Sequence, residues 1–281
     1  ALDRLKARQM QLQYHVARFA DVQAALDRRN TAKRVPLFPP PLPERDPYAM
    51  TIQHLSSIVQ MLDVYANPVS QHPEMTAHGG FSDIRLPHDT FVECAHAAYR
   101  VALAQGRPRN MAFLDVGCGG GVKVLSASKF FATCHGLELD PGYADAARRL
   151  FGTFNDPTLA VHEEDALTSR RYDAYDVVYF YQPMKDAEKL QVLERQICET
   201  VAKNTILIAP YPSFAKRAAD LGCAELERSL YVAGIDAEEA AELRARAETT
   251  GLAVGATRPH SPREALWAPL VDAFLDCGWA I

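Results

Sequence analysis

Near its middle the chain reads Phe113-Leu114-Asp115-Val116-Gly117-Cys118-Gly119-Gly120-Gly121. An apolar run with strand character leads into a glycine-rich turn, and a helical pattern begins near Val122. Glycine lets the backbone turn tightly and approach a ligand without side-chain interference. The amides at the start of the next helix can face polar or anionic ligand atoms. The stretch therefore predicts a strand–turn–helix unit that binds a ligand at its turn.

The spacing of these glycines distinguishes two classes of nucleotide-binding protein. The dinucleotide fingerprint G-x-G-x-x-G/A requires a small residue at its last position. Read from Gly117 that position is Val122, and the frame that starts at Gly119 fails as well. The pattern present is acid-x-G-x-G-x-G, with Asp115 as the acid. It resembles the first motif of class I S-adenosylmethionine-dependent methyltransferases, and the resemblance covers roughly residues 111–210.

This resemblance implies an α/β fold with a doubly wound, mostly parallel sheet. It also implies S-adenosylmethionine as the cofactor and S-adenosylhomocysteine as the product. In the loop, the expected cofactor-binding residues are Asp115, Gly117, Cys118, Gly119 and Gly121. Asp115 has an alternative role that is also expected within the family, which is to hold the loop amides in place.

A carboxylate follows the second predicted strand. Glu138 lies about 20 residues beyond the loop, where a carboxylate can accept hydrogen bonds from both ribose hydroxyls. The alternatives are an exposed turn acid or part of a helix cap before Pro141. Beside it, Leu139 is expected to flank the adenine ring, although apolar residues at strand ends are more often part of the core.

Three acids follow the third predicted strand. In similar enzymes an acid at this place accepts a hydrogen bond from the adenine amino group. Among Glu163, Glu164 and Asp165 we choose Asp165, and we add Ala166 to the cofactor-binding set. Each feature is weak alone, but the loop and the acids occur in the order that the family requires.

The run from Asp176 to Pro183 resembles the fourth strand and its catalytic edge. Tyr181 and Gln182 are the residues expected to position the methyl acceptor, whereas Tyr179 is expected to pack in the core. Methyl transfer from a sulfonium is an in-line displacement, so the protein contributes mainly by holding the acceptor in place. It need not supply a nucleophile, and a general base is optional.

Strands alternate with helices from Met111 onward, which predicts a parallel sheet covered on both faces. The predicted strands are 111–116, 133–138, 158–162, 175–181 and 205–210, with a sixth near 228–235. Helices are predicted at 48–65, after Asp89 as a cap, at 236–250 and at 262–276. Residues 111–281 then form the Rossmann-like binding domain with C-terminal helices, and residues 48–110 form a helical segment and loop on the substrate side.

The N-terminal part has a different pattern. Residues 1–34 predict a helical arm, because Leu5, Leu12, Phe19 and Leu26 recur every seven residues. Such a helix packs on its own domain or binds a partner, either a second copy or another protein. Residues 35–47 predict a proline-rich linker, with five prolines among the first nine residues.

Composition restricts the function classes. The chain of 281 residues is 48% hydrophobic with a net charge of −5, which argues against a broad nucleic-acid footprint. No apolar run is long enough for a membrane span. The six cysteines are scattered without a Cys-x-x-Cys pair, which favours reduced thiols in a cytoplasmic protein over a disulfide framework or structural zinc. The histidines show no metal-ligand spacing, and we expect no metal.

The sequence therefore predicts S-adenosylmethionine-dependent methyl transfer to an unidentified acceptor, with a small molecule favoured over protein or RNA. One alternative is an NAD(P)-dependent oxidoreductase, which the failed third glycine and the missing Tyr-x-x-x-Lys pattern oppose. Another is a non-catalytic scaffold that keeps the fold and binds a partner through its N-terminal helix.

Overall fold

The computed structural model describes residues 34–38, 40, 43, 46–66, 72, 74–75, 86–107 and 110–250. The predicted arm of residues 1–34, apart from Arg34, and the predicted helix at 262–276 lie outside the described residues.

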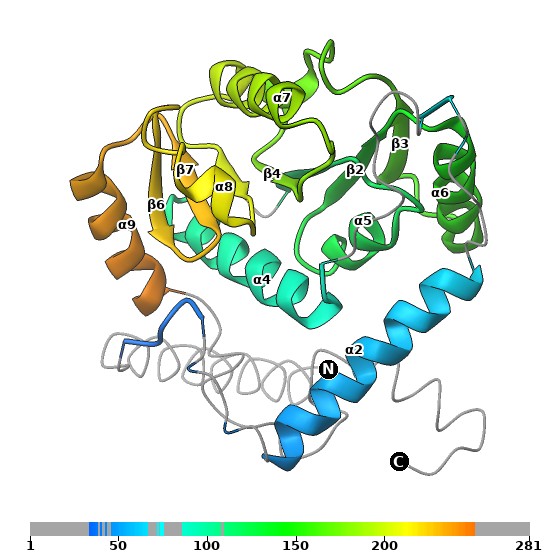
Figure 1. The fold of residues 1–281 in the computed structure, drawn as a ribbon. Helices are drawn as coiled ribbons and strands as arrows, with labels where there is room; N and C mark the ends of the chain where they lie inside the picture. The colour runs from blue at the N-terminus through cyan, green and yellow to red at the C-terminus, as the bar shows by residue number, and fades with distance from the viewer. Residues whose placement is uncertain are drawn as a thin grey trace, which may run out of the picture.

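A seven-stranded sheet forms the centre of the described part, in the order β3-β2-β1-β4-β5-β7-β6 (Figure 1). The strands are β1 (Ala112–Val116), β2 (Thr133–Glu138), β3 (Leu159–Glu163), β4 (Val177–Phe180), β5 (Ile206–Ile208), β6 (Cys223–Glu227) and β7 (Leu230–Ala233). The first five strands pair in parallel, and β7 runs antiparallel to both β5 and β6. This is the sheet order of the class I methyltransferase fold, and it confirms the predicted fold class and five parallel strands.

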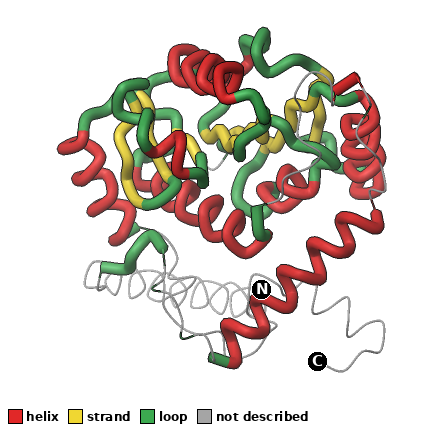
Figure 2. Tube along the Cα trace, in the orientation of Figure 1, coloured by secondary structure: helices red, strands yellow, loops and turns green. Residues whose placement is uncertain are grey.

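Two layers of helices cover the sheet, as the tube trace shows (Figure 2). One layer contains α4 (His88–Ala104), α5 (Val122–Ala127), α6 (Pro141–Phe154) and α9 (Ala237–Thr249). The other contains the 3-10 helix η1 (Arg171–Ala174), α7 (Ala187–Thr200) and α8 (Pro212–Ala215). Each layer buries its own apolar cluster against one face of the sheet, so the strands are apolar on both faces, as parallel strands require.

Sequence analysis predicted only one of the two strands that form the β6–β7 hairpin. The sixth predicted strand is present as β7, but β6 was not predicted. It lies at the sheet edge and carries charged residues, and its turn at Arg228 and Ser229 has no glycine. Arg228 itself adopts a φ of 54°, a conformation that glycine or asparagine usually signals in a hairpin turn.

Helix α2 (Pro47–Ala66) packs against α4. The prediction that Asp89 caps α4 is wrong. Helix α4 begins at His88, two residues earlier than predicted, so its cap position is Pro87 and Asp89 lies in the first turn. There its carboxylate accepts a hydrogen bond of 2.9 Å from the Ser56 hydroxyl of α2. Asp89 thus joins two helices and also places negative charge near the helix N-terminus. Helix α4, part of the segment expected on the substrate side, belongs to the layer that covers the sheet.

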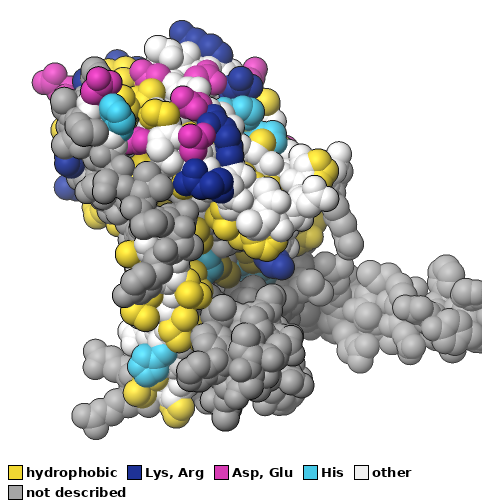
Figure 3. Space-filling model, turned by 90° about the vertical axis from the view of Figure 1, so that its right-hand side faces the viewer, with side chains coloured by type: hydrophobic (Ala, Val, Ile, Leu, Met, Phe, Trp, Pro, Cys, Tyr) yellow, Lys and Arg dark blue, Asp and Glu magenta, His cyan; other side chains and the backbone are white. Residues whose placement is uncertain are grey.

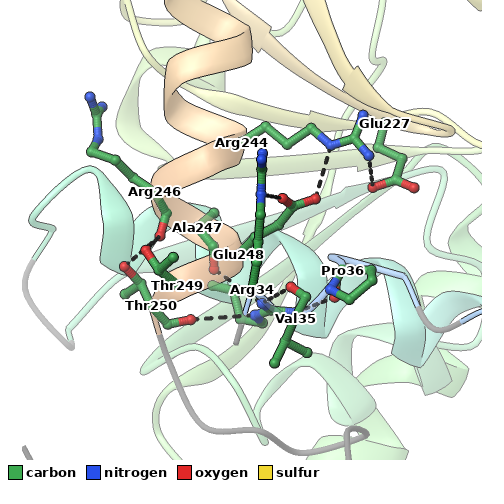
Figure 4. Close-up of polar contacts among 11 residues, drawn as sticks. Arg34, Val35, Pro36, Glu227, Arg244, Arg246, Ala247, Glu248, Thr249 and Thr250 are labelled. Atoms are coloured by element: carbon green, nitrogen blue, oxygen red, sulfur yellow. Dashed lines mark hydrogen bonds and ion pairs between the residues drawn. The ribbon is translucent and has the colours of Figure 1, made fainter. Parts of the chain in front are cut away.

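The start of the proline-rich segment is anchored to α4 and α9 (Figure 4). The buried Arg100 of α4 donates to the carbonyls of Val35 and Pro36 at 2.8 and 2.7 Å. The same guanidinium donates to the carbonyls of Ala247 and Thr250 at 3.1 and 3.5 Å. Leu37 and Phe38 follow and are buried.

Two properties of the described residues concern possible partners: the distribution of surface charge, and the length and apolar character of the helices. On the face shown in Figure 3, basic and acidic side chains are interspersed and do not gather into one cationic patch. Arg148 of α6, for example, pairs with Asp145 and with Glu163. No helix in the described ranges has the length and apolar character to cross a membrane.

Candidate functional site

The predicted site residues converge on one edge of the sheet. Strands β1 to β4 are parallel neighbours, so their carboxyl ends lie side by side. Residues 117–121 follow β1, Glu138 ends β2, Asp165 follows β3, and Tyr181 follows β4. In open α/β sheets ligands bind outside this edge.

The loop after β1 needs its glycines for conformation and for space. Gly117, Gly119 and Gly121 have φ values of 79°, 53° and 84°, in the left-handed region. A Cβ on Gly121 would lie 2.7 Å from the Phe151 ring, and one on Gly117 would lie 2.9 Å from Cβ of Pro183. The loop is therefore packed closely between α6 and the segment after β4.

Hydrogen bonds join the loop after β1 to the end of β2. The amides of Gly117 and Cys118 both donate to the Leu137 carbonyl, at 2.8 and 3.1 Å. The Cys118 side chain is 8% exposed and points under the loop, where a Cβ on Gly136 would lie 2.3 Å from its sulfur. Gly136 thus supports the loop from below. Sequence analysis did not select it, although a glycine inside a strand is a signal for close backbone approach.

Glu138 lies beside the loop, with its carboxylate bonded to loop and turn amides. One carboxylate oxygen accepts from the Gly119 amide and the other from the Asp140 amide, both at 2.8 Å. Each oxygen keeps a further lone pair that can accept from a ligand hydroxyl. Burial raises the pKa of Glu138, and the two amide hydrogen bonds act in the opposite direction. The helix cap considered for this acid is formed by Asp140 instead, which accepts from the Gly142 amide at the start of α6.

The three acids after β3 have different partners. Glu163 pairs with Arg148 at 2.8 Å, and Glu164 pairs with Arg171 at 2.7 Å. Both therefore serve ion pairs at the surface. Asp165 has no ion pair among the described residues.

Asp165 and Ala166 carry one acceptor and one donor to which none of the described residues bonds. The Asp165 Oδ1 atom accepts from the Leu167 amide at 2.9 Å, which fixes the carboxylate. Within the part of the chain that the structure describes, the other oxygen of Asp165 and the amide of Ala166 have no partner. Leu139 is nearby in the fold, at the end of the neighbouring strand, and is 42% exposed although it is apolar.

The segment after β4 forms the candidate acceptor edge. Gln182 adopts a φ of 44°, which is costly for a residue with a side chain and is typical of functional sites. Its side-chain amide has no hydrogen-bond partner among the described residues. Tyr181 is partly exposed, whereas Tyr179 is buried with its ring centroid 5.0 Å from that of Phe91. Tyr179 thus packs in the core, as expected.

A buried ionic cluster supports this edge from behind. The fully buried carboxylate of Glu194 in α7 accepts from the Tyr211 hydroxyl at 2.9 Å and from Arg217 at 2.6 Å. The Tyr211 ring lies edge-on to Tyr181, with centroids 6.4 Å apart. Sequence analysis missed this cluster. The available signal was an acid within the apolar stripe of α7, beside Leu193.

Comparisons with known proteins give structural neighbours only, because no family model and no curated protein matches the chain. An amino pentose methyltransferase from Micromonospora echinaspora, solved with S-adenosylmethionine bound, is 24% identical over 49% of this chain and 54% of its own, with a TM-score of 0.36. A sugar N-methyltransferase from a Streptoalloteichus species is 21% identical over 50% and 54%, with a TM-score of 0.36.

An RNA methyltransferase from Salinibacter ruber in complex with S-adenosyl-L-homocysteine is 18% identical over 45% of this chain and 76% of its own, with a TM-score of 0.35. The chain spans about half the length of the first two proteins. The fold class follows from the strand order and the glycine loop described above.

Proposed function

We propose that this protein binds S-adenosylmethionine at the carboxyl edge of β1 to β3 and transfers its methyl group to an acceptor held beside β4. The observation that carries the proposal is the order of groups along this edge. A bare glycine loop, a carboxylate beside it, and an open acceptor–donor pair occur at the ends of three adjacent strands.

Each group fits one part of the cofactor. The Glu138 oxygens would accept from the ribose hydroxyls, since each retains a lone pair. The open oxygen of Asp165 would accept from the adenine amino group, and the Ala166 amide would donate to the neighbouring ring nitrogen. The exposed Leu139 side chain would cover one face of the ring. The loop would hold the amino-acid end of the cofactor with main chain alone.

The cofactor supplies an already activated methyl group, so the protein's task is to orient the acceptor. Tyr181 and Gln182 would perform this task, and their position after the strand next to β1 supports that role. Gln182 has a strained backbone, and its side-chain amide, which has no partner among the described residues, can donate to or accept from an acceptor atom. We favour a small-molecule acceptor over protein or RNA, and the net charge of −5 counts against RNA, which is a polyanion.

Ligand-dependent melting tests the proposal. A ligand selective for the native state raises the melting midpoint by mass action. S-adenosylmethionine and S-adenosylhomocysteine should each raise it, and NAD should not. A shift with NAD alone would overturn the proposal, and binding without turnover across a broad acceptor panel would favour the scaffold alternative.

Two substitutions sharpen this test. Glu138→Gln should weaken S-adenosylhomocysteine binding roughly 10- to 100-fold, because a hydrogen bond to a charged group contributes about 1.5–3 kcal/mol. Glu163→Gln is the matched control, since it removes a carboxylate at the end of the neighbouring strand that pairs only with Arg148 among the described residues. Its affinity should equal that of the unmodified protein. Equal affinities for both variants would show that Glu138 is not a cofactor ligand.

A further inference from the structure

Two cysteines lie in contact on the side of the sheet covered by α7. Cys198 is in the last turn of α7, and Cys223 is the first residue of β6. Their sulfur atoms are 3.5 Å apart. Cys94, Cys118 and Cys134 are buried, and none of them has a sulfur neighbour within the described residues.

The positions of the two cysteines suit a covalent link. A disulfide has a sulfur–sulfur distance of about 2.03–2.05 Å, so the atoms must approach by about 1.5 Å. Both residues lie at the ends of their elements, where a small shift does not disturb the centre of a helix or strand. Cys198 is partly exposed while Cys223 is buried, so a dissolved oxidant reaches Cys198 first.

We propose that Cys198 and Cys223 form a reversible disulfide that ties α7 to β6. With oxidised glutathione as the oxidant, the thiolate of one cysteine attacks the glutathione disulfide and releases one glutathione thiolate. The thiolate of the other cysteine then attacks the protein sulfur of the mixed disulfide and releases the second. In total the two protein thiols lose two electrons and two protons, and one oxidised glutathione becomes two reduced molecules.

The link would lie toward the sheet edge opposite the acceptor edge, because Cys223 pairs with Ala233, whose amide donates to Thr205 just before β5. Cys198 lies one helical turn after Glu194, whose carboxylate holds Tyr211 and Arg217. Oxidation would therefore fix the part of α7 that carries this cluster against the β6–β7 hairpin. The proposal concerns thiol chemistry alone and stands independently of methyl transfer.

Peptide mapping of the full chain tests the proposal. The protein is equilibrated with oxidised glutathione, remaining thiols are alkylated, and digested peptides are analysed by mass spectrometry without reduction. We expect one cross-link between the peptides that contain Cys198 and Cys223, and its loss with dithiothreitol. The melting midpoint of the oxidised form should be higher by about 5 °C or more, because a cross-link restricts the unfolded chain.

Variants separate this pair from other thiols. Cys198→Ser, at a partly exposed site, should abolish the cross-link and the redox-dependent difference in melting midpoint. Cys94→Ala, which alters a buried cysteine elsewhere, should leave both unchanged. Full alkylation of Cys198 and Cys223 after oxidation would overturn the proposal, as would a cross-link that joins either residue to another cysteine.

Discussion

The contact between Gly136 and Cys118 gives a quantitative test of how the sheet supports the loop. In Gly136→Ala the added Cβ would lie 2.3 Å from the Cys118 sulfur and 2.8 Å from its Cβ. Carbon atoms in good contact are about 3.5–4.0 Å apart, so the loop must rise by about 1 Å. Overpacking of this kind costs about 1–3 kcal/mol.

The same shift would weaken the two hydrogen bonds from Gly117 and Cys118 to the Leu137 carbonyl. Each contributes about 1 kcal/mol. We therefore expect Gly136→Ala to lower the free energy of unfolding by about 3 kcal/mol in a urea titration. Calorimetry should show weaker S-adenosylhomocysteine binding as well, because the displaced loop is the proposed ligand-binding surface.

A double-mutant cycle identifies the contact responsible. Cys118→Ala removes the sulfur that lies closest to the new methyl group, so Gly136→Ala should cost at least about 1 kcal/mol less in that background. Gly152→Ala is the control, because a Cβ there meets nothing within 4 Å and a helix gains about 0.5–1 kcal/mol from the change. If the losses at Gly136 and Cys118 add to within about 0.5 kcal/mol, the proposed support of the loop is wrong.

Three further predictions concern other groups. Arg100→Met should lower the free energy of unfolding by about 3 kcal/mol or more in urea, because buried carbonyls lose a charged donor; Arg100→Lys should recover only part, since it lacks the planar fork. Tyr211→Phe should cost about 1.5–3 kcal/mol by the same measurement, because it removes a hydrogen bond to the Glu194 carboxylate; no loss would mean that this carboxylate needs no second partner. The raised pKa of Glu138 means that its carboxylate protonates at a higher pH than an ordinary glutamate as the pH falls. S-adenosylhomocysteine affinity should therefore weaken on acidification. The contribution of Glu138 to folding stability should increase over the same range, because the folded state binds the proton more tightly. Calorimetry across pH, with Glu138→Gln as the reference, would contradict this if both proteins gave the same profile.

The parts of the fold that the sequence predicted correctly are those that a few consecutive residues determine. The apolar strands, the glycine loop and the acid at Glu138 are each visible within a few residues, and the first five strands are confirmed. Among the three acids after β3, Glu163 and Glu164 have arginine partners. The choice of Asp165 as the cofactor ligand stays a prediction.

The features that were missed depend on contacts between distant segments. Gly136 signals a close backbone approach inside a strand, but only the fold shows that the approaching group is the Cys118 side chain. Glu194 acquires its role from Tyr211 and Arg217, which belong to a later part of the chain. The strand β6 was overlooked because an edge strand with charged residues has no continuous apolar pattern.

The anchoring by Arg100 has a consequence for shortened forms of this protein. One guanidinium holds carbonyls from residues 35–36 and from residues 247–250, which are far apart in sequence but adjacent in space. Deleting the chain before residue 38 would leave buried donors without acceptors, and so would deleting it after residue 246. A fragment shortened at either boundary would therefore be less stable, because the Arg100 guanidinium would lose carbonyl acceptors. The segments before and after the sheet supply these acceptors together.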